Sequence, residues 1–352
     1  MSDTRILVVD DSVVVRKLVT DQLGSVPGLE VVGTAANGKI ALRKVELERP
    51  DVVVLDVEMP VMDGLETLRE IKRREEHPLV IMFSSFTTKG AQVTVDALAL
   101  GAEDYVAKPT NLLDAEQGAK AIRDELAGKI QLLTGQTPTP RKPAPPKPTR
   151  VVDDTPPSSI DVLAIGSSTG GPNALAEFFS RLPRSFPVPI LIVQHMPAIF
   201  TPHLADRLAR ESVLEVHEAE DGTVAQAGHA YIAPGGRHLK VTGSAAKPVL
   251  RLDDSPPVHS CRPAADVLFT SVHETYGRHC LAAVLTGMGE DGLAGARLIR
   301  EGGGRVLIQD EASSVVWGMA GAISRAGLAD AELPVLDLAD EIIHRARVGR
   351  SK

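Results

Sequence analysis

The chain has 352 residues, a formal net charge of −8 and only 3% aromatic residues. This length predicts two domains, and the negative charge without a basic, aromatic-rich stripe excludes a general nucleic-acid binder. The two cysteines, Cys261 and Cys280, form no CxxC pair, which favours a reducing, cytoplasmic setting over a disulfide framework or zinc ribbon. No apolar run approaches about eighteen residues, so we expect neither a signal peptide nor membrane insertion.

The first third of the chain alternates short β-branched runs with helix-like stretches. The expected strands are Ile6–Val9, Val31–Thr34, Val52–Leu55, Leu79–Phe83 and Asp104–Val106. This alternation predicts a parallel, doubly wound α/β sheet, in a domain that we place at residues 1–133.

Composition changes abruptly at Thr137–Thr149, where six residues are proline. Such a segment cannot build a core, and we expect an extended tether within a Pro-rich linker at residues 134–159. Docking of these prolines into an SH3-like groove is an alternative, but a plain spacer is favoured.

After Ser159 the alternation resumes. The expected strands are Val162–Ile165, Ile190–Val193, Ala230–Ile232, Leu281–Leu285 and Arg305–Ile308. They predict a second doubly wound, mostly parallel α/β domain at residues 160–352. The Gly- and Pro-rich stretch Val224–Val258 predicts an antiparallel hairpin added to its sheet.

Acidic side chains and a lysine follow strands of the first domain. Asp10 and Asp11 follow the first strand, Asp56 ends the third, and Lys108 follows the fifth. Parallel strands end at one edge of a sheet, so these groups are expected to converge there. Mg²⁺ would relieve the mutual repulsion of the carboxylates, and with Lys108 would allow one of them to attack a phosphodonor. Any single aspartate could merely end a strand, but the set favours phosphoryl chemistry.

Several segments of the first domain form a familiar pattern: Val8–Ser12, Leu55-Asp56, Met59–Gly64, Ser84, Tyr105 and Lys108-Pro109. With them the domain resembles a response-regulator receiver, a flavodoxin-like (βα)5 fold. The resemblance implies that Asp56 accepts a phosphoryl group. It also implies that Asp11, Asp56 and the Glu58 carbonyl bind Mg²⁺ with support from Asp10.

The same resemblance assigns a phosphate switch to three residues of the first domain. It implies that Ser84 contacts the phosphoryl oxygens and that Tyr105 changes rotamer on activation, and Lys108 is expected to neutralise the incoming phosphate.

Ser168 lies in a tight turn between an expected strand and an expected helix at Pro172–Arg181. Its segment Gly166–Gly171 contains Gly-x-Ser-x-Gly, the spacing of a nucleophile elbow. A serine hydroxyl is a weak nucleophile and needs a base that is oriented by an acid.

His195 directly follows Ile190–Gln194, and Asp291 stands shortly beyond Leu281–Leu285. Both are therefore expected at the same sheet edge as Ser168. The chain order Ser, His, Asp differs from the Ser, Asp, His order of α/β-hydrolases, so that family does not match.

A competing interpretation concerns Gly287–Gly292, a literal GxGxxG between an expected strand and a helix at Leu293–Glu301. Asp310 lies about twenty residues on, as in a dinucleotide-binding fingerprint. The acidic Glu290 and Asp291 would face a pyrophosphate unfavourably, so this alternative is disfavoured.

Long motifs connect the second domain with one family. They are Ile165–Gly171, Val193–Pro197, Ile232–His238, Arg262-Pro263, Asp266–Phe269, Leu285–Gly292 and Gln309–Ser314. From Ile160 to about Asp340 the domain resembles the catalytic domain of chemotaxis protein-glutamate methylesterases. Two departures are Ser167, where relatives often have alanine, and Cys261, where histidine is common.

The resemblance implies that Ser168 is the nucleophile, His195 the general base and Asp291 the orienting acid. It also implies that the Met288 amide contributes to the oxyanion hole and that Thr169 lies beside the nucleophile.

The expected activity is phosphorylation-activated hydrolysis of glutamate γ-methyl esters on chemoreceptors, with deamidation of glutamines. A chemotaxis histidine kinase is the expected phosphodonor, and the catalytic domain is expected to need no cofactor. A phosphorylation-switched adaptor without turnover is the alternative from another class.

Overall fold

The computed structural model describes residues 3–108, 119–120, 122–135 and 159–348. The chain divides into two compact units, residues 1–142 and 143–352. The Pro-rich segment Thr137–Thr149 lies outside the described residues, so its role as a tether stays a prediction.

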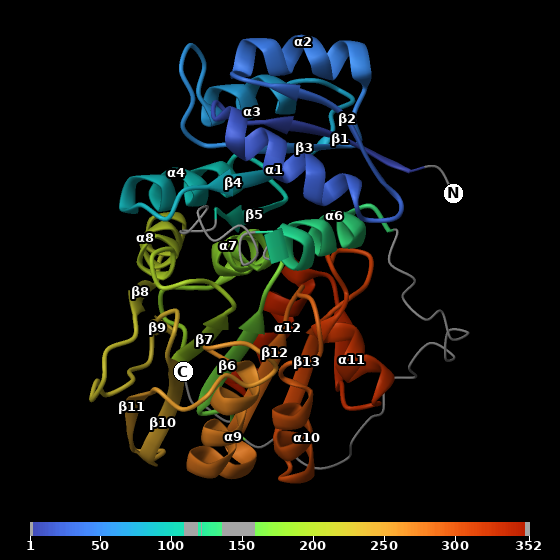
Figure 1. The fold of residues 1–352 in the computed structure, drawn as a ribbon. Coiled ribbons are helices and arrows are strands. Elements are labelled where there is room, and N and C mark those ends of the chain that lie inside the picture. The colour runs from blue at the N-terminus through green and yellow to red at the C-terminus, as the bar shows by residue number, and fades with distance from the viewer. Residues whose placement is uncertain (1–2, 109–118, 121, 136–158, 349–352) are drawn as a thin grey trace. The chain divides into compact units, whose positions relative to one another are not determined.

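The first unit contains a five-stranded parallel sheet in the order β2-β1-β3-β4-β5 (Figure 1). The strands are β1 (Thr4–Val9), β2 (Leu29–Ala35), β3 (Val52–Asp56), β4 (Leu79–Ser84) and β5 (Asp104–Ala107). Each predicted run lies inside one of these strands, and the flavodoxin-like topology is confirmed.

Helices cover both faces of this sheet. They are α1 (Val13–Gly24), α2 (Gly38–Glu48), α3 (Gly64–Lys72), α4 (Thr88–Ala99), the π-helix η1 (Ile122–Ala127) and α6 (Gly128–Leu133). Helix α1 packs with η1 on one face, and α2, α3 and α4 form the other layer. Side chains of Ser12, Asn37, Asp63 and Thr87 cap the first four helices, which explains where these helices begin.

The second unit is built on a seven-stranded parallel sheet in the order β14-β13-β12-β6-β7-β9-β8. The strands are β6 (Val162–Ser167), β7 (Ile190–Gln194), β8 (Glu215–Glu218), β9 (His229–Ile232), β12 (Cys280–Val284), β13 (Arg305–Gln309) and β14 (Ala331–Leu333). The sequence did not predict β8 and β14, because both are short edge strands without a buried apolar run.

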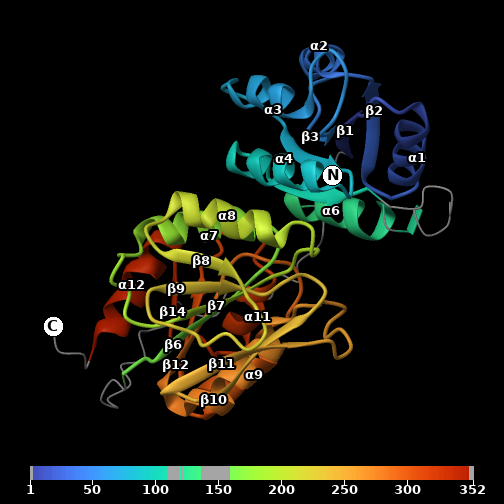
Figure 2. The same ribbon diagram turned by 90° about the vertical axis from the view of Figure 1, so that its left-hand side faces the viewer.

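The predicted hairpin exists, but its expected addition to the main sheet is wrong. Strands β10 (His238–Ser244) and β11 (Lys247–Asp253) form a separate two-stranded sheet. Strand β8 already covers the edge beyond β9, and the buried hairpin residues Leu239 and Leu250 belong to the same core as α9 (Ala265–Tyr276). Figure 2 shows the hairpin beside that helix.

Two helical layers enclose the sheet of the second unit. One contains α7 (Gly171–Arg181), α8 (Thr201–Glu211) and α12 (Val335–Arg347). The other contains α9, the 3₁₀ turn η2 (Gly277–His279), α10 (Leu293–Glu301) and α11 (Met319–Arg325). Phe269 of α9 is fully buried, and a Cβ atom at Gly166 or Gly292 would lie 3.4 or 3.3 Å from its ring.

Phe269→Ala is expected to destabilise the second unit, because the lost ring leaves a cavity beneath Gly166 of β6 and Gly292 of the loop after β12. We expect its free energy of unfolding to fall by about 3–5 kcal/mol. Urea denaturation of the full chain measures this, with Leu298→Ala, 40% exposed on α10, as the control. Equal effects of the two substitutions would contradict this account of the packing.

Candidate active site

The pairing of β6 with β7 places the predicted serine next to the predicted histidine. Ser167 is in register with Gln194, so Ser168 and His195 are the first residues beyond two neighbouring strands. The His195 amide donates to the Ser167 carbonyl at 3.0 Å, and the Gln194 side-chain amide donates to the Ser168 carbonyl at 2.9 Å. These bonds fix the backbone of both candidate catalytic residues.

The turn around Ser168 depends on closely approaching glycines. Gly170 has a φ of +75°, which favours glycine, and the Gly171 amide donates to the Ser168 carbonyl at 2.8 Å. The Ser168 amide donates to the Thr286 carbonyl at 3.0 Å, and a Cβ atom at Gly287 would lie 2.8 Å from the Ser168 Cβ. The loop after β12 therefore contacts the serine turn directly.

Asp291 is 2% exposed and is held at the N-terminus of α9. Its carboxylate accepts hydrogen bonds from the amides of Ala265 (2.6 Å) and Asp266 (3.0 Å), and its Oδ2 lies 2.8 Å from His195 Nε2. Burial raises the pKa of Asp291, but the bonds to His195 and the backbone amides outweigh burial and lower it below its ordinary value. The dipole of α9 also lowers this pKa, because the N-terminus of a helix favours a negatively charged carboxylate.

The imidazole of His195 contacts a second group. Its Nδ1 lies 3.6 Å from Cys261 Sγ, while Nε2 faces Asp291. Burial lowers the pKa of His195, but the hydrogen bonds with Asp291 and Cys261 raise it to about 9. Among the described residues no hydrogen bond joins the Ser168 hydroxyl to this ring. The three predicted residues thus share one sheet edge, with His195 and Asp291 in direct contact.

Two further predicted residues border this site. Met288 follows Gly287 and is 49% exposed, and Thr169 is 5% exposed with its carbonyl bonded to the Thr286 hydroxyl at 2.9 Å. Their assigned contributions stay predictions.

Gln194 is a residue that the sequence analysis missed. Its Oε1 accepts a 2.7 Å hydrogen bond from the fully buried Ser167 hydroxyl, while its Nε2 bonds to the Ser168 carbonyl. A glutamine at the end of an otherwise apolar buried strand was the available signal. Ser167 is enclosed in this way, whereas its neighbour Ser168 is partly exposed.

The loop Gly287–Gly292 uses its glycines for conformation. Gly289 and Gly292 have φ angles of +86° and +93°, and Gly287 leaves space for Ser168. The same loop supplies Asp291 to the imidazole. Its spacing is therefore explained without a dinucleotide.

His259, Asp266 and Asp291 offer ligand atoms within 4.8 Å of one another. The Asp266 carboxylate already accepts from the Gly295 amide at 2.7 Å and pairs with His259 Nε2 at 3.1 Å. Asp291 is likewise occupied by amides and His195. We interpret the cluster as a hydrogen-bond network that supports the acid.

In the first unit the predicted acidic pocket converges as expected. Lys108 Nζ lies 2.7 Å from Asp10 Oδ2 and 2.8 Å from Asp56 Oδ1. Oxygens of Asp10, Asp11 and Asp56 all lie within 4.8 Å of one another, and Asp11 is exposed. A hard cation fits this all-oxygen donor set.

The lysine and the buried carboxylates influence one another's protonation. Burial raises the pKa of Asp56 to about 6, with Lys108 opposing and Asp10 adding to the rise. For Lys108, burial lowers the pKa, but Asp56 and Asp10 outweigh burial and raise it.

Two of the three residues of the predicted phosphate switch, Ser84 and Tyr105, are buried. The Ser84 hydroxyl is fully buried and accepts from the Thr94 hydroxyl at 2.7 Å. Tyr105 is 5% exposed, and Lys129 Nζ lies 5.1 Å from its ring centre. The exposed Glu58 has its amide 3.4 Å from Asp56 Oδ1. Pro109 lies outside the described residues.

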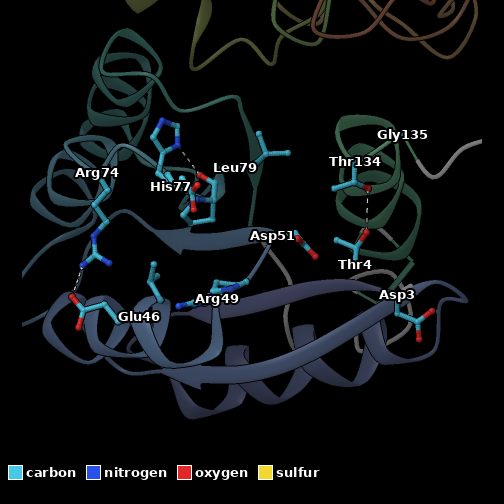
Figure 3. Close-up of a pocket in the computed structure, with 14 residues that line it drawn as sticks. Asp3, Thr4, Glu46, Arg49, Asp51, Arg74, His77, Leu79, Thr134 and Gly135 are labelled. Carbon is cyan, nitrogen blue, oxygen red and sulfur yellow. Dashed lines mark hydrogen bonds and ion pairs between the residues drawn. The ribbon is translucent and has the colours of Figure 1, made fainter. Parts of the chain in front are cut away.

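A cavity of about 1100 Å³ lies at the opposite edge of the same sheet (Figure 3). It is lined where β1, β3 and β4 begin, by Thr4, Asp51 and Leu79, and by charged residues of both signs, among them Glu46 and Arg74, which form a 3.0 Å ion pair. The acidic pocket is at the carboxyl ends of these strands, so this cavity does not belong to it.

Within the described part of the chain, no helix has the length and apolar character that crossing a membrane would require.

Comparisons with known proteins agree with this geometry. The family model for CheB methylesterase matches residues 163–342, and that for the response regulator receiver domain matches residues 6–120. Proteins named protein-glutamate methylesterase/protein-glutamine glutaminase are similar over nearly the full length. One from Trichodesmium erythraeum is 47% identical, covering 98% of this chain and 99% of its own. One from a Nocardioides species is 49% identical, covering 98% and 96%.

A solved structure is similar to the second unit. The CheB methylesterase catalytic domain of Thermotoga maritima is 41% identical with a TM-score of 0.52, covering 53% of this chain and 99% of that domain. With full-length relatives well above 30% identity and both family models matched in the observed units, the chain belongs to the CheB methylesterase family and carries a response-regulator receiver domain before its methylesterase domain.

Proposed function

We propose that this chain is a phosphorylation-controlled protein-glutamate methylesterase that also deamidates glutamines. The observation that carries the proposal is the contact of His195 with the buried Asp291, at the sheet edge where Ser168 occupies a partly exposed turn. The names of the full-length relatives support the same activity. An adaptor without turnover would not require a base that a buried acid orients.

The proposed reaction proceeds through an acyl-enzyme. Ser168 Oγ attacks the ester carbonyl while His195 takes the hydroxyl proton, and Asp291 stabilises the imidazolium that forms. The Met288 amide, next to the serine turn, would donate to the oxyanion, and Thr169 would border the substrate. Methanol leaves with the proton from His195, and water then hydrolyses the acyl-enzyme. A glutamine substrate follows the same path with ammonia as the leaving group.

Since Asp291 occupies Nε2, the nitrogen that must accept the Ser168 proton is Nδ1. The serine hydroxyl or the ring has to rotate before the reaction, because Nδ1 faces Cys261 in this conformation. Hydrogen bonds of catalytic groups are often completed only when substrate is bound.

In the receiver domain, Asp56 is the proposed phosphoryl acceptor. Asp11, Asp56 and the Glu58 carbonyl would hold Mg²⁺, supported by Asp10, and the ion supplies positive charge beside the phosphoryl oxygens. Lys108 already contacts the Asp56 carboxylate and would follow the transferred group.

Ser84 and Tyr105 would transmit the effect of phosphorylation. For this the buried Ser84 hydroxyl has to give up its hydrogen bond with Thr94 and form one with the phosphoryl group.

The proposed partners follow from the family and from the receiver. Methyl-accepting chemoreceptors would be the substrate, and a chemotaxis histidine kinase would supply the phosphoryl group. Both place the protein in the cytoplasm. Phosphorylation of the receiver would raise the esterase activity by shifting a conformational equilibrium of the chain.

Ser168→Ala should reduce methanol release from methylated receptor membranes by at least about 10⁴-fold, because it removes the attacking oxygen. Ser167→Ala is the matched control, and its rate should stay within about tenfold of the native rate because that hydroxyl is enclosed by Gln194. The reverse result would move the nucleophile to Ser167.

Ester hydrolysis should accelerate as pH rises through neutrality. With the His195 pKa at about 9, only a small fraction of the imidazole is free to take a proton at pH 7. We expect kcat/KM to rise about tenfold per pH unit below that value, measured by methanol release from pH 6 to 9. Asp291→Asn should lower the maximum about 10⁴-fold and move the rise to lower pH. A flat native profile would refute this assignment of the base.

Acetyl phosphate with Mg²⁺ should stimulate methanol release by the native chain and leave Asp56→Asn at its basal rate, because the amide cannot accept the phosphoryl group. Asp21→Asn, which changes an exposed aspartate on α1, is the control and should respond like the native chain. Stimulation of Asp56→Asn would place the acceptor elsewhere.

A further inference from the structure

Cys261 is a second nucleophilic side chain in contact with the general base. Its Sγ lies 3.6 Å from His195 Nδ1, and the opposite ring nitrogen lies 2.8 Å from Asp291 Oδ2. Sulfur, imidazole and carboxylate thus form a continuous series of contacts. A nucleophile within reach of a base that an acid orients is the arrangement that activates a side chain for covalent chemistry.

A tight turn fixes Cys261 in this position. Val258 and Cys261 form an antiparallel bridge with amide-to-carbonyl distances of 3.0 and 2.8 Å. The two intervening residues, His259 and Ser260, have φ angles of +50° and +62°, as in a type I′ turn, although neither is glycine. His259 is held by its 3.1 Å contact with Asp266, so the turn is anchored to α9.

The other cysteine shows what an inert thiol looks like in the same domain. Cys280 is fully buried, its Sγ donates to the Gly277 carbonyl at 3.0 Å, and burial raises its pKa to about 12. Cys261 differs from Cys280 in its burial and in its partner. It is only partly buried, and its Sγ contacts an imidazole. Thiols beside a protonated histidine react readily because the positive charge stabilises the thiolate, whereas thiols in apolar surroundings do not.

We propose that Cys261 is a reactive thiol served by the His195–Asp291 pair, and that its capture by a small disulfide reversibly stops ester hydrolysis. The loss of activity rests on the proposed function, whereas the reactivity of the thiol does not.

In the capture step the Cys261 proton passes to solvent, the protonated His195 imidazole stabilises the thiolate from Nδ1, and the thiolate attacks one sulfur of the disulfide. A new S–S bond forms as the old one breaks, and the departing thiolate carries away the electron pair. The leaving thiolate takes up a proton from solvent, which balances the one that Cys261 released, and the imidazole stays protonated.

The adduct would stand beside Nδ1, the nitrogen that Ser168 needs because Nε2 is occupied by Asp291. The mixed disulfide therefore obstructs the base without changing the serine. A thiol reductant reverses the exchange and frees the base.

The reactivity is measured with 4,4′-dithiodipyridine at pH 6, where an ordinary thiol with a pKa of about 8.5 is only about 0.3% ionised. Absorbance follows the released thiopyridone, and peptide mass spectrometry locates the adduct. We expect one equivalent to react at Cys261 in the folded full-length chain, at least fivefold faster than in the chain unfolded by guanidinium. Cys280 should stay unmodified in the folded chain.

His195→Gln should slow the labelling of Cys261 at least fivefold, with circular dichroism as the check of folding. Cys261→Ser should abolish the fast phase. Equal rates in the folded and unfolded native chain, or preferential labelling of Cys280, would overturn the proposal even if the His195 variant failed to fold.

The consequence for activity is measured on the same labelled protein. Methanol release should fall at least tenfold after labelling and recover with dithiothreitol, whereas whatever activity Cys261→Ser retains should not respond to the reagent. Full activity of the labelled native chain would overturn the inhibitory effect. If the untreated chain released no methanol, the proposed esterase function would fail, and the labelling rates would still decide the reactivity.

Discussion

The buried carboxylate of Asp291 is the interaction on which the second unit's site depends. Removing a charged carboxylate from water is unfavourable unless donors surround it. Two amides at the start of α9 and the imidazole of His195 provide those donors. The acid thereby joins the loop after β12 to α9 and to the residue that follows β7. The orientation of the His195 ring therefore depends on α9 through Asp291.

The same topological rule produces both sites of the chain. In each sheet the first strand lies inside the order, and its neighbours on the two sides come from different parts of the chain. The carboxyl ends on either side of that strand gather residues that are distant in sequence. In the first unit Asp10 and Asp56 meet across β1 and β3. In the second, β6 lies between β7 and β12, which bring His195 and the Asp291 loop to Ser168.

Around His195 the geometry creates a competition for one ring nitrogen. Asp291 engages Nε2, which leaves Nδ1 as the position for a nucleophile's proton. Cys261 occupies that position in the structure, and Ser168 lies at the adjacent strand end. The shared base therefore links ester hydrolysis to the chemical state of a thiol. Asp266, at the start of α9, contributes two contacts to this arrangement. Its carboxylate contacts His259 in the turn at residues 258–261, and its amide donates to the Asp291 carboxylate.

Much of the fold and the candidate site was predictable from local sequence patterns. Buried parallel strands appear as continuous β-branched runs, and residues directly after them are expected at the functional edge. Ser168, His195, Asp10 and Asp56 could be placed in that way. The edge strands β8 and β14 could not, because four- and three-residue strands with little burial leave no periodic signal.

The sequence by itself determined the two α/β units, the acidic pocket and the strand-end positions of the serine and the histidine. Only the tertiary structure decided that the hairpin packs on α9 and that Gln194 fixes the serine turn. It also decided that Nε2 faces Asp291 while Nδ1 faces Cys261. The side-chain contacts join residues that are 26 to 96 positions apart in the sequence, and the packing of the hairpin on α9 joins whole elements. Local propensity carries no information on such pairings, because side-chain orientation is selected by long-range packing and hydrogen bonding.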